Sequence, residues 1–319
     1  MSAFPYRQRI GKRMKKNILA ESKRKRGNRA LKLRHDMIAW CLLLPTLICF
    51  TFFVWRPTIV GIVYSFYDLK GFEPVKFVGL RNYKVILSNT QFLRTLWNTV
   101  QYVCYFFFIA FIPPILVAIM LSEVRFARKT FKFLIYFPAI VPGVVTNLLW
   151  TYIYEPGPYG ILNRLLGVFG IEPQLWLNSK STVILSIIIS VSWNGLGASM
   201  LYYFAALQGV NRDLYEASVI DGAGIFARIK HITFPQISGV VLLMFVRNII
   251  SIFQIMEEPL MMTEGGPNGS SMTLGLLGYR YAFEYYQSSY ALALGVIEFL
   301  MLIGLTVLYF KMSNKIETA

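Results

Sequence analysis

The stretch that decides the fold runs from Glu216 to Pro235, EASVIDGAGIFARIKHITFP, and it is a charged, glycine-containing island between two long apolar runs. Residues 215–220 can begin a short helix, and residues 225–234 can begin a second one. Gly222 and Gly224 permit a tight turn between them at low steric cost. The closing proline lacks the N–H that a helix interior needs, so the second segment must bend there or give way to the next span. The stretch therefore predicts a helix-turn-helix elbow, with an ordinary polar loop as the simpler alternative.

The composition around this island is that of a membrane protein. The chain has 319 residues, of which 55% are hydrophobic and only 15% charged, and its mean hydropathy is +0.51. A soluble domain has nearer a quarter of charged residues. Runs of about twenty apolar residues, each long enough to cross roughly 30 Å of hydrocarbon, recur six times. These features predict an all-α polytopic protein with spans at about 38–67, 96–121, 131–154, 182–207, 237–262 and 290–312.

Three segments outside or between the spans complete this domain organisation. A basic tail covers residues 1–37, the loop 208–236 carries the elbow, and residues 313–319 form a second tail after the six-span domain 38–312. The first apolar run is too long for a signal peptide and has no cleavage site behind it, so it stays in the protein.

The net charge of +16 arises largely from the first tail, since thirteen of the 32 Lys and Arg residues lie at or before Arg34. No aromatic residues alternate with this cluster as a stacking platform would require, so binding to the anionic lipid bilayer is favoured over nucleic acid. Segments on the side of the amino terminus hold 22 of the 32 basic residues and those on the other side hold eight. Because positive loops stay inside, both termini and the elbow are predicted to be cytoplasmic.

The island also carries a spaced motif: a Glu-Ala-small start, a glycine six positions later and an Ile-x-apolar-Pro end. It resembles the EAA motif of ABC importer permeases, whose Asp-Gly-Ala variant belongs to the sugar-importing branch. Ser218 stands where that motif has Ala, and Phe234 where it has Leu. The matching positions are Glu216, Ala217, Ser218, Asp221, Gly222, Ala223, Ile232, Phe234 and Pro235.

Further resemblance extends over nearly the whole chain. The segments that carry it are FVGLRNY (77–83), Asn98-Thr99, FPAIVPGVV (137–145), GILNRLL (160–166) and TEGGP (263–267). Together they are similar to the carbohydrate-uptake permeases, and the chain looks like a six-span relative of the larger maltose-transporter permease subunit. It lacks a large inserted outer domain, because only about 27 residues, 155–181, separate spans three and four.

The resemblance implies a bacterial or archaeal cell-membrane importer. In this family a second permease subunit completes the pore, usually as a heterodimer, and each elbow acts as a coupling helix on one of two ATPase subunits. An extracytoplasmic solute-binding protein delivers the substrate, here a saccharide and most simply an oligosaccharide. ATP and Mg would be bound by the ATPase partners, because no GxxxxGK[ST] phosphate loop occurs in this chain. The chain is therefore expected to be a transport subunit rather than an enzyme, with no catalytic, cofactor or metal residues of its own.

A substrate path can be expected from polar residues within the spans, since charges at membrane depth usually face a protein interior or a wet cavity. Arg247, Ser251, Gln254 and Glu258 recur at helical spacing on span five, with Glu257 beside them. A structural ion pair and interfacial acids are the alternative reading of these charges. Amide, aromatic and carboxylate groups on spans three, four and six could add contacts to saccharide hydroxyls: Asn147, Trp150, Tyr154, Trp193, Asn194, Tyr202 and Glu298.

Two rival functions remain open from the residues alone. An importer for glycerol phosphate or a polyol would carry the same elbow, because that motif reports on the ATPase interface and not on the cargo. An ATP-independent secondary carrier is the other alternative, although no internal repeat of the kind common in carriers is evident.

Overall fold

The computed structural model describes residues 37, 39–124 and 126–317, and the chain forms two units, residues 1–63 and 64–319. All of the predicted basic tail except Met37 lies outside the described residues. The first span is helical from Ala39 to Tyr64. It contains a π-helical segment, Thr51–Trp55, and continues as α2 (Arg56–Tyr64).

The second unit is mainly helical and carries one small antiparallel hairpin. Its elements are β1 (Tyr67–Lys70), β2 (Glu73–Phe77), α3 (Arg81–Ser88), α4 (Thr90–Phe106), α5 (Ile112–Glu123), α6 (Arg128–Tyr136), α7 (Gly143–Ile153), α8 (Ile161–Gly167), α9 (Val183–Gln208), α10 (Arg212–Ile220), α11 (Ile225–Arg228), α12 (Phe234–Phe253), α13 (Glu257–Thr263), α14 (Leu274–Tyr279) and α15 (Ser288–Glu317).

Five helical runs among the described residues are long and apolar enough to cross a membrane: Ala39–Tyr64, Thr90–Glu123, Val183–Gln208, Ile225–Phe253 and Ser288–Lys311. A sixth span results if the bent pair Arg128–Ile140 and Gly143–Ile153 is counted as one. The predicted all-α polytopic architecture is therefore confirmed, and the sequence analysis did not predict the hairpin β1–β2 or the short helices α3, α8 and α14.

Prolines shape three of these runs. Pro57, Pro113 and Pro235 each follow closely on a π-helical segment, Thr51–Trp55, Phe107–Phe111 or Ile229–Thr233. A proline ring clashes with the carbonyl four residues earlier and supplies no N–H to it. Widening the preceding turn to i→i+5 bonding removes that clash while the helix continues.

Span three is bent instead of widened. Its two halves meet at an angle of 93°, where the 3₁₀ segment Phe137–Ile140 ends and Pro142 caps α7. Pro142 cannot donate to the carbonyl of Pro138. The amide of Val141 donates to that oxygen at 3.1 Å, and the side-chain Nδ2 of Asn194 on α9 adds a second bond at 3.0 Å, so a neighbouring helix also supports the break.

Span five ends nine residues earlier than predicted. The helix stops at Phe253, and a separate short helix, α13, begins at Glu257. Pro259 explains the difference: it cannot lie inside a continuing α12, but it is tolerated in the first turn of a new helix, where its missing N–H has no partner to lose.

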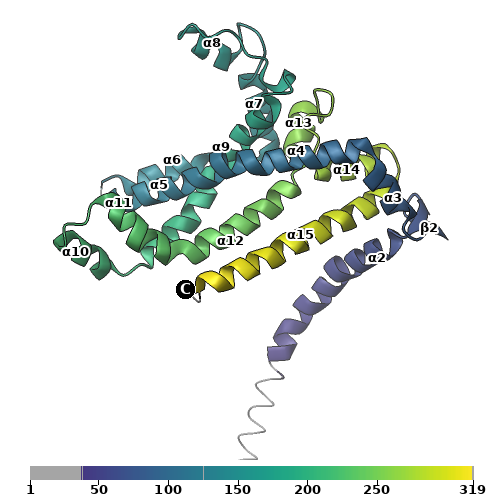
Figure 1. Ribbon diagram of the computed structural model, residues 1–319, viewed down its shortest axis with the longest axis horizontal. Helices are drawn as coiled ribbons and strands as arrows, with labels where there is room; N and C mark the ends of the chain where they lie inside the picture. Colours follow the sequence, from purple (N-terminus) through teal and green to yellow (C-terminus); the bar gives the residue numbers. More distant parts are fainter. Residues whose placement is uncertain (1–36, 38, 125, 318–319) are drawn as a thin grey trace, which may run out of the picture. The chain divides into compact units, whose positions relative to one another are not determined.

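The long helix α9 packs against α4, α5, α7 and α12. Figure 1 shows α10 and α11 at one end of this unit, and α14 with the hairpin at the other. A buried apolar cluster near the elbow includes Phe111, Met200, Tyr203, Ile237 and Met244. A second cluster, at the opposite end, is formed mainly by α14 and α15.

Candidate functional site

The elbow has two helical arms that meet in a glycine turn. α10 begins after Asn211, whose side chain accepts the backbone N–H of Asp213 at 3.0 Å and caps the helix. At the other end the amide of Ala223 bonds the carbonyl of Ser218 at 2.9 Å, and that of Gly222 bonds Val219 at 3.1 Å. This pair of bonds is a Schellman motif, which requires a left-handed residue at the position of Gly222.

Gly222 has φ +75°, whereas Gly224 has an ordinary φ of −67°. No atom of the described residues lies within 4 Å of a Cβ built on either glycine. The elbow therefore needs glycine at 222 for backbone conformation, not for space within this chain.

The two arms are joined at their base. The hydroxyl groups of Tyr215 and Thr233 lie 3.0 Å apart, and Thr233 is buried. Ser218 is also buried and donates its hydroxyl to the carbonyl of Tyr215 at 2.7 Å. Ile232 packs against the apolar cluster near the elbow. These contacts fix the angle between α10 and the helix that leads into span five.

The outer surface of the elbow is unusually apolar for a polar-looking segment. Ile220 is 86% exposed and Phe226 is 85% exposed, and Val219 and Ile225 are exposed beside them in the sequence. The remaining predicted coupling residues are also exposed or half-buried: Glu216, Ala217, Asp221, Ala223 and Pro235. The side chain of Glu216 makes no hydrogen bond or ion pair within the described part of the chain.

Several predicted substrate-path residues come together around α7. The rings of Trp150 and Tyr154 lie 5.2 Å apart, and Trp193 of α9 meets Trp150 edge-on at 6.0 Å. The hydroxyl of Tyr154 donates to the carbonyl of Ser186 at 3.0 Å, so Tyr154 is tied to α9. Asn194 holds the bend of span three through Pro138 and Thr146.

Two buried donors of this group have no partner. The side-chain Nδ2 of Asn147 and the indole Nε1 of Trp150 are buried, and neither has a hydrogen-bond partner among the described residues. They lie three positions apart, on the same side of α7. Buried polar atoms are normally paired, so these two N–H groups are able to donate hydrogen bonds to an external oxygen ligand.

The predicted polar face of span five is divided by the end of α12. Arg247 and Ser251 lie on that helix and Gln254 caps it, and all three are exposed. The Arg247 guanidinium lies 5.5 Å from the centre of the Tyr202 ring. The prediction that Glu258 continues this face is wrong, because Glu258 belongs to α13.

Glu257 and Glu298 are also separate from that face. The carboxylate of Glu257 lies against Gly143 in the first turn of α7, since a Cβ built on this glycine would be 2.8 Å from Oε1. A negative charge is stabilised at a helix N-terminus. Glu298 lies on α15, where its Oε1 is buried without a partner among the described residues.

Two structural residues were missed from the sequence. A Cβ on Gly197 would be 2.3 Å from the carbonyl oxygen of Ile135, so α6 and α9 are in backbone contact there. Asn163 in the loop 155–181 is buried and makes four hydrogen bonds, to Gly157, Trp176 and twice to Gln174, at 2.7–3.0 Å. The GILNRLL segment was noticed, but only as a resemblance.

Comparison with known proteins gives this arrangement a family. Residues 104–317 match the binding-protein-dependent transport system inner membrane component family. The chain belongs to that family. Its resemblance to ABC importer permeases is thereby confirmed, and the elbow lies within the matched residues.

Individual relatives agree with this assignment. The arabinooligosaccharides transport system permease protein AraP of Bacillus subtilis (strain 168) is 30% identical over 86% of this chain and 87% of its own length. The sn-glycerol-3-phosphate transport system permease protein UgpA of Pectobacterium atrosepticum is 30% identical over 87% of this chain and 94% of its own. A chain of the bacterial alginate ABC transporter, solved with an alginate pentasaccharide-bound periplasmic protein, is 24% identical. The match covers 89% of this chain and 96% of the transporter chain, with a TM-score of 0.79, so the two chains share the fold.

Proposed function

We propose that this chain is a permease subunit of an ATP-driven importer for a saccharide delivered by an extracytoplasmic solute-binding protein. The observation that carries the proposal is the elbow: a Schellman turn at Gly222, arms joined by Tyr215 and Thr233, and a projecting apolar surface at Ile220 and Phe226. An exposed apolar patch on a well-ordered turn is typical of a protein interface.

The occupant of that interface is, in this proposal, an ATPase subunit. The elbow would be cytoplasmic by the distribution of basic residues, and the second arm is continuous with span five. ATP and Mg would be bound by two such subunits, and a second permease would complete the pore. Closure of the ATPase pair would push on the elbows and change the access of the spans.

A saccharide is the cargo that α7 supports best. The unpaired Asn147 and Trp150 donors, with the aromatic faces of Trp150 and Trp193, offer the mixture of hydrogen bonds and flat apolar surface that suits a sugar ring. The similarity to the arabinooligosaccharides permease AraP also favours a saccharide. Glycerol phosphate is a second candidate, because Arg247 presents an exposed cation and a glycerol-3-phosphate permease is among the relatives.

The test is ATP hydrolysis by the assembled importer in lipid, with its binding protein and with neutral oligosaccharides or glycerol 3-phosphate. We expect an oligosaccharide to stimulate hydrolysis. Gly222→Leu should abolish stimulation, and Gly224→Leu should retain it, because only position 222 needs a positive φ. Transport that persists without ATP would overturn the importer assignment in favour of a carrier.

A second pair of variants tests the cargo site. Trp150→Phe keeps an aromatic ring but removes the unpaired N–H, and it should raise the saccharide concentration needed for half-maximal transport. Trp97→Phe makes the same change at an exposed position of α4 and should have no effect. Equal behaviour of the two variants would show that Trp150 does not contact the saccharide.

A further inference from the structure

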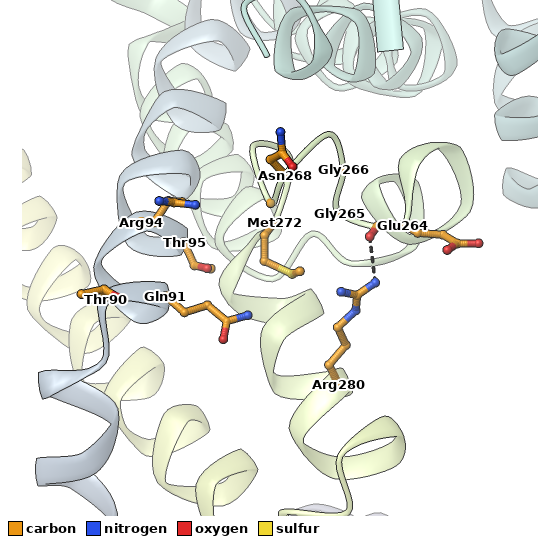
Figure 2. Close-up of a pocket in the computed structure, with 11 residues that line it drawn as sticks. Thr90, Gln91, Arg94, Thr95, Glu264, Gly265, Gly266, Asn268, Met272 and Arg280 are labelled. Atoms are coloured by element: carbon orange, nitrogen blue, oxygen red, sulfur yellow. Dashed lines mark hydrogen bonds between the residues drawn. The ribbon is translucent and has the colours of Figure 1, made fainter. Parts of the chain in front are cut away.

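A cavity of about 460 Å³, with polar residues on its walls, lies at the end of the second unit away from the elbow. One wall is the start of α4, with Gln91, Arg94 and Thr95, and the other is the loop that follows α13 (Figure 2). None of the residues of the predicted substrate path lines it.

The loop that forms the second wall is held in place by hydrogen bonds from α4. The Nδ2 of Asn98 donates to the carbonyls of Gly269 and Met272 at 2.8 and 3.0 Å, and the hydroxyl of Tyr102 donates to Ser271 at 3.1 Å. Asn98 and Tyr102 are both buried. α4 therefore holds the loop in place and fixes the width of the cavity.

Two arginines line this space, Arg94 from α4 and Arg280 from the π-helical segment that follows α14. Arg280 is fixed, because its Nη2 donates to the backbone carbonyl of Glu264 at 2.7 Å and its Nε lies 3.2 Å from Glu284. Arg94 is exposed, and its side chain has no hydrogen bond or ion pair with the described residues. Figure 2 shows the Glu264 side chain pointing away from the cavity, so it does not neutralise Arg94.

This arrangement suits a carboxylate. A guanidinium group binds a carboxylate through two parallel N–H···O bonds, and Arg94 has both of its donor edges available. The neighbouring Gln91, Thr95 and Asn268 add neutral donors around the same space.

We propose that this cavity, with Arg94 as its free cation, receives an acidic side chain of the extracytoplasmic solute-binding protein. The inference rests on the proposed function, which supplies that partner and places this end of the molecule outside. It favours a protein carboxylate over an acidic saccharide, because the cavity shares no residue with the predicted substrate path.

The electrostatics can be tested with small probes. In a background in which Cys41, Cys49 and Cys104 are replaced by Ser, Gln91→Cys places one thiol in the cavity wall. We expect an anionic methanethiosulfonate reagent to modify it at least about threefold faster when Arg94 is present than in Arg94→Gln, and a cationic reagent to show the opposite trend. Arg81→Gln removes a charge from α3, outside the cavity, and should change neither rate.

The partner is tested with the solute-binding protein that stimulates ATP hydrolysis of the assembled importer. Arg94→Gln should weaken its binding about tenfold and flatten the salt dependence of binding, whereas Arg81→Gln should match the parent. The same protein should protect the thiol at position 91 from both reagents.

The outcomes separate the two proposals. If the parent importer binds no such protein, the proposed function fails. The cavity proposal then fails with it, because the proposed partner of the cavity does not bind. If the parent is stimulated but Arg94→Gln binds like Arg81→Gln, the cavity proposal alone is wrong. If Arg94→Gln affects transport of uronate oligosaccharides but not binding of the protein, the carboxylate belongs to the cargo and the assignment to the binding protein is overturned.

Discussion

The hydroxyl groups of Tyr215 and Thr233 lie 3.0 Å apart and connect the two arms of the elbow. The bond links α10 to the π-helical segment that leads into α12, and Thr233 is buried beside it. It is a polar contact between α10 and the segment that leads into the fifth span.

Tyr215→Phe should loosen this connection. The change leaves the ring in place but deprives a buried hydroxyl of its partner, at a cost of about 1 kcal/mol. We expect the amides of α10 to exchange hydrogen about fivefold faster, and saccharide-stimulated ATP hydrolysis to fall. Tyr159→Phe, at an exposed position far along the chain, is the control. Unchanged exchange in Tyr215→Phe would mean that apolar packing alone holds the arms.

Gly222→Ala and Gly224→Ala form a matched pair, since neither new Cβ meets another atom of the described residues. Only Gly222 has a positive φ, and a left-handed alanine costs about 1 kcal/mol. The Ala223 amide should therefore exchange faster in Gly222→Ala and remain protected in Gly224→Ala. Equal protection in both variants would show that the Schellman turn does not limit the stability of the elbow.

Gly197→Ala should destabilise the whole helical unit. Its Cβ would be 2.3 Å from the carbonyl oxygen of Ile135 and 2.6 Å from the Cα of Tyr136, and backbone atoms cannot rotate away. Overpacking of this kind costs about 1–3 kcal/mol. The midpoint of thermal unfolding in detergent should fall relative to Gly195→Ala, which adds a methyl group to open space on the same helix. A midpoint equal to that of the control would mean that α6 and α9 separate easily.

Asn163→Ala should open the loop 155–181. It removes four hydrogen bonds, each worth about 1 kcal/mol, from a buried position. We expect trypsin to cleave after Arg164 much faster than in the parent. Asn178→Ala changes an exposed residue of the same loop and should leave the cleavage rate unaltered. Slow cleavage in both variants would show that the tilted ring contact between Tyr154 and Trp176 is sufficient to hold the loop.

The elbow could be predicted from the sequence because its signals are local. Two glycines, a proline and an uninterrupted helical segment on either side determine where each arm begins and ends. The residues at which the spans end were harder to predict from the sequence. Glu258 was assigned to the polar face of span five because its spacing fits a helix, but the helix it was assigned to ends before Pro259.

The cavity could not have been predicted in the same way. Arg94 and Arg280 are separated by 186 positions in the sequence, and hydrogen bonds from α4 to the loop, made by Asn98 and Tyr102, bring their two segments together. Asn98 and the TEGGP segment both carry the family resemblance, but nothing in the sequence indicates that Asn98 bonds the loop that follows this segment. Such pairings depend on tertiary packing, which a single sequence does not display.

The continuity of α11, the π-helical segment and α12 has a mechanical consequence. Residues Ile225–Phe253 form one helical run of 29 residues, which at about 1.5 Å per residue is a rod on the order of 43 Å long. A force applied at the exposed Phe226 is therefore delivered to Gln254 at the far end without crossing any joint between separate helices. The π-helical turn Ile229–Thr233 lies within this run, ahead of Pro235, so any force passed from Phe226 to Gln254 goes through it.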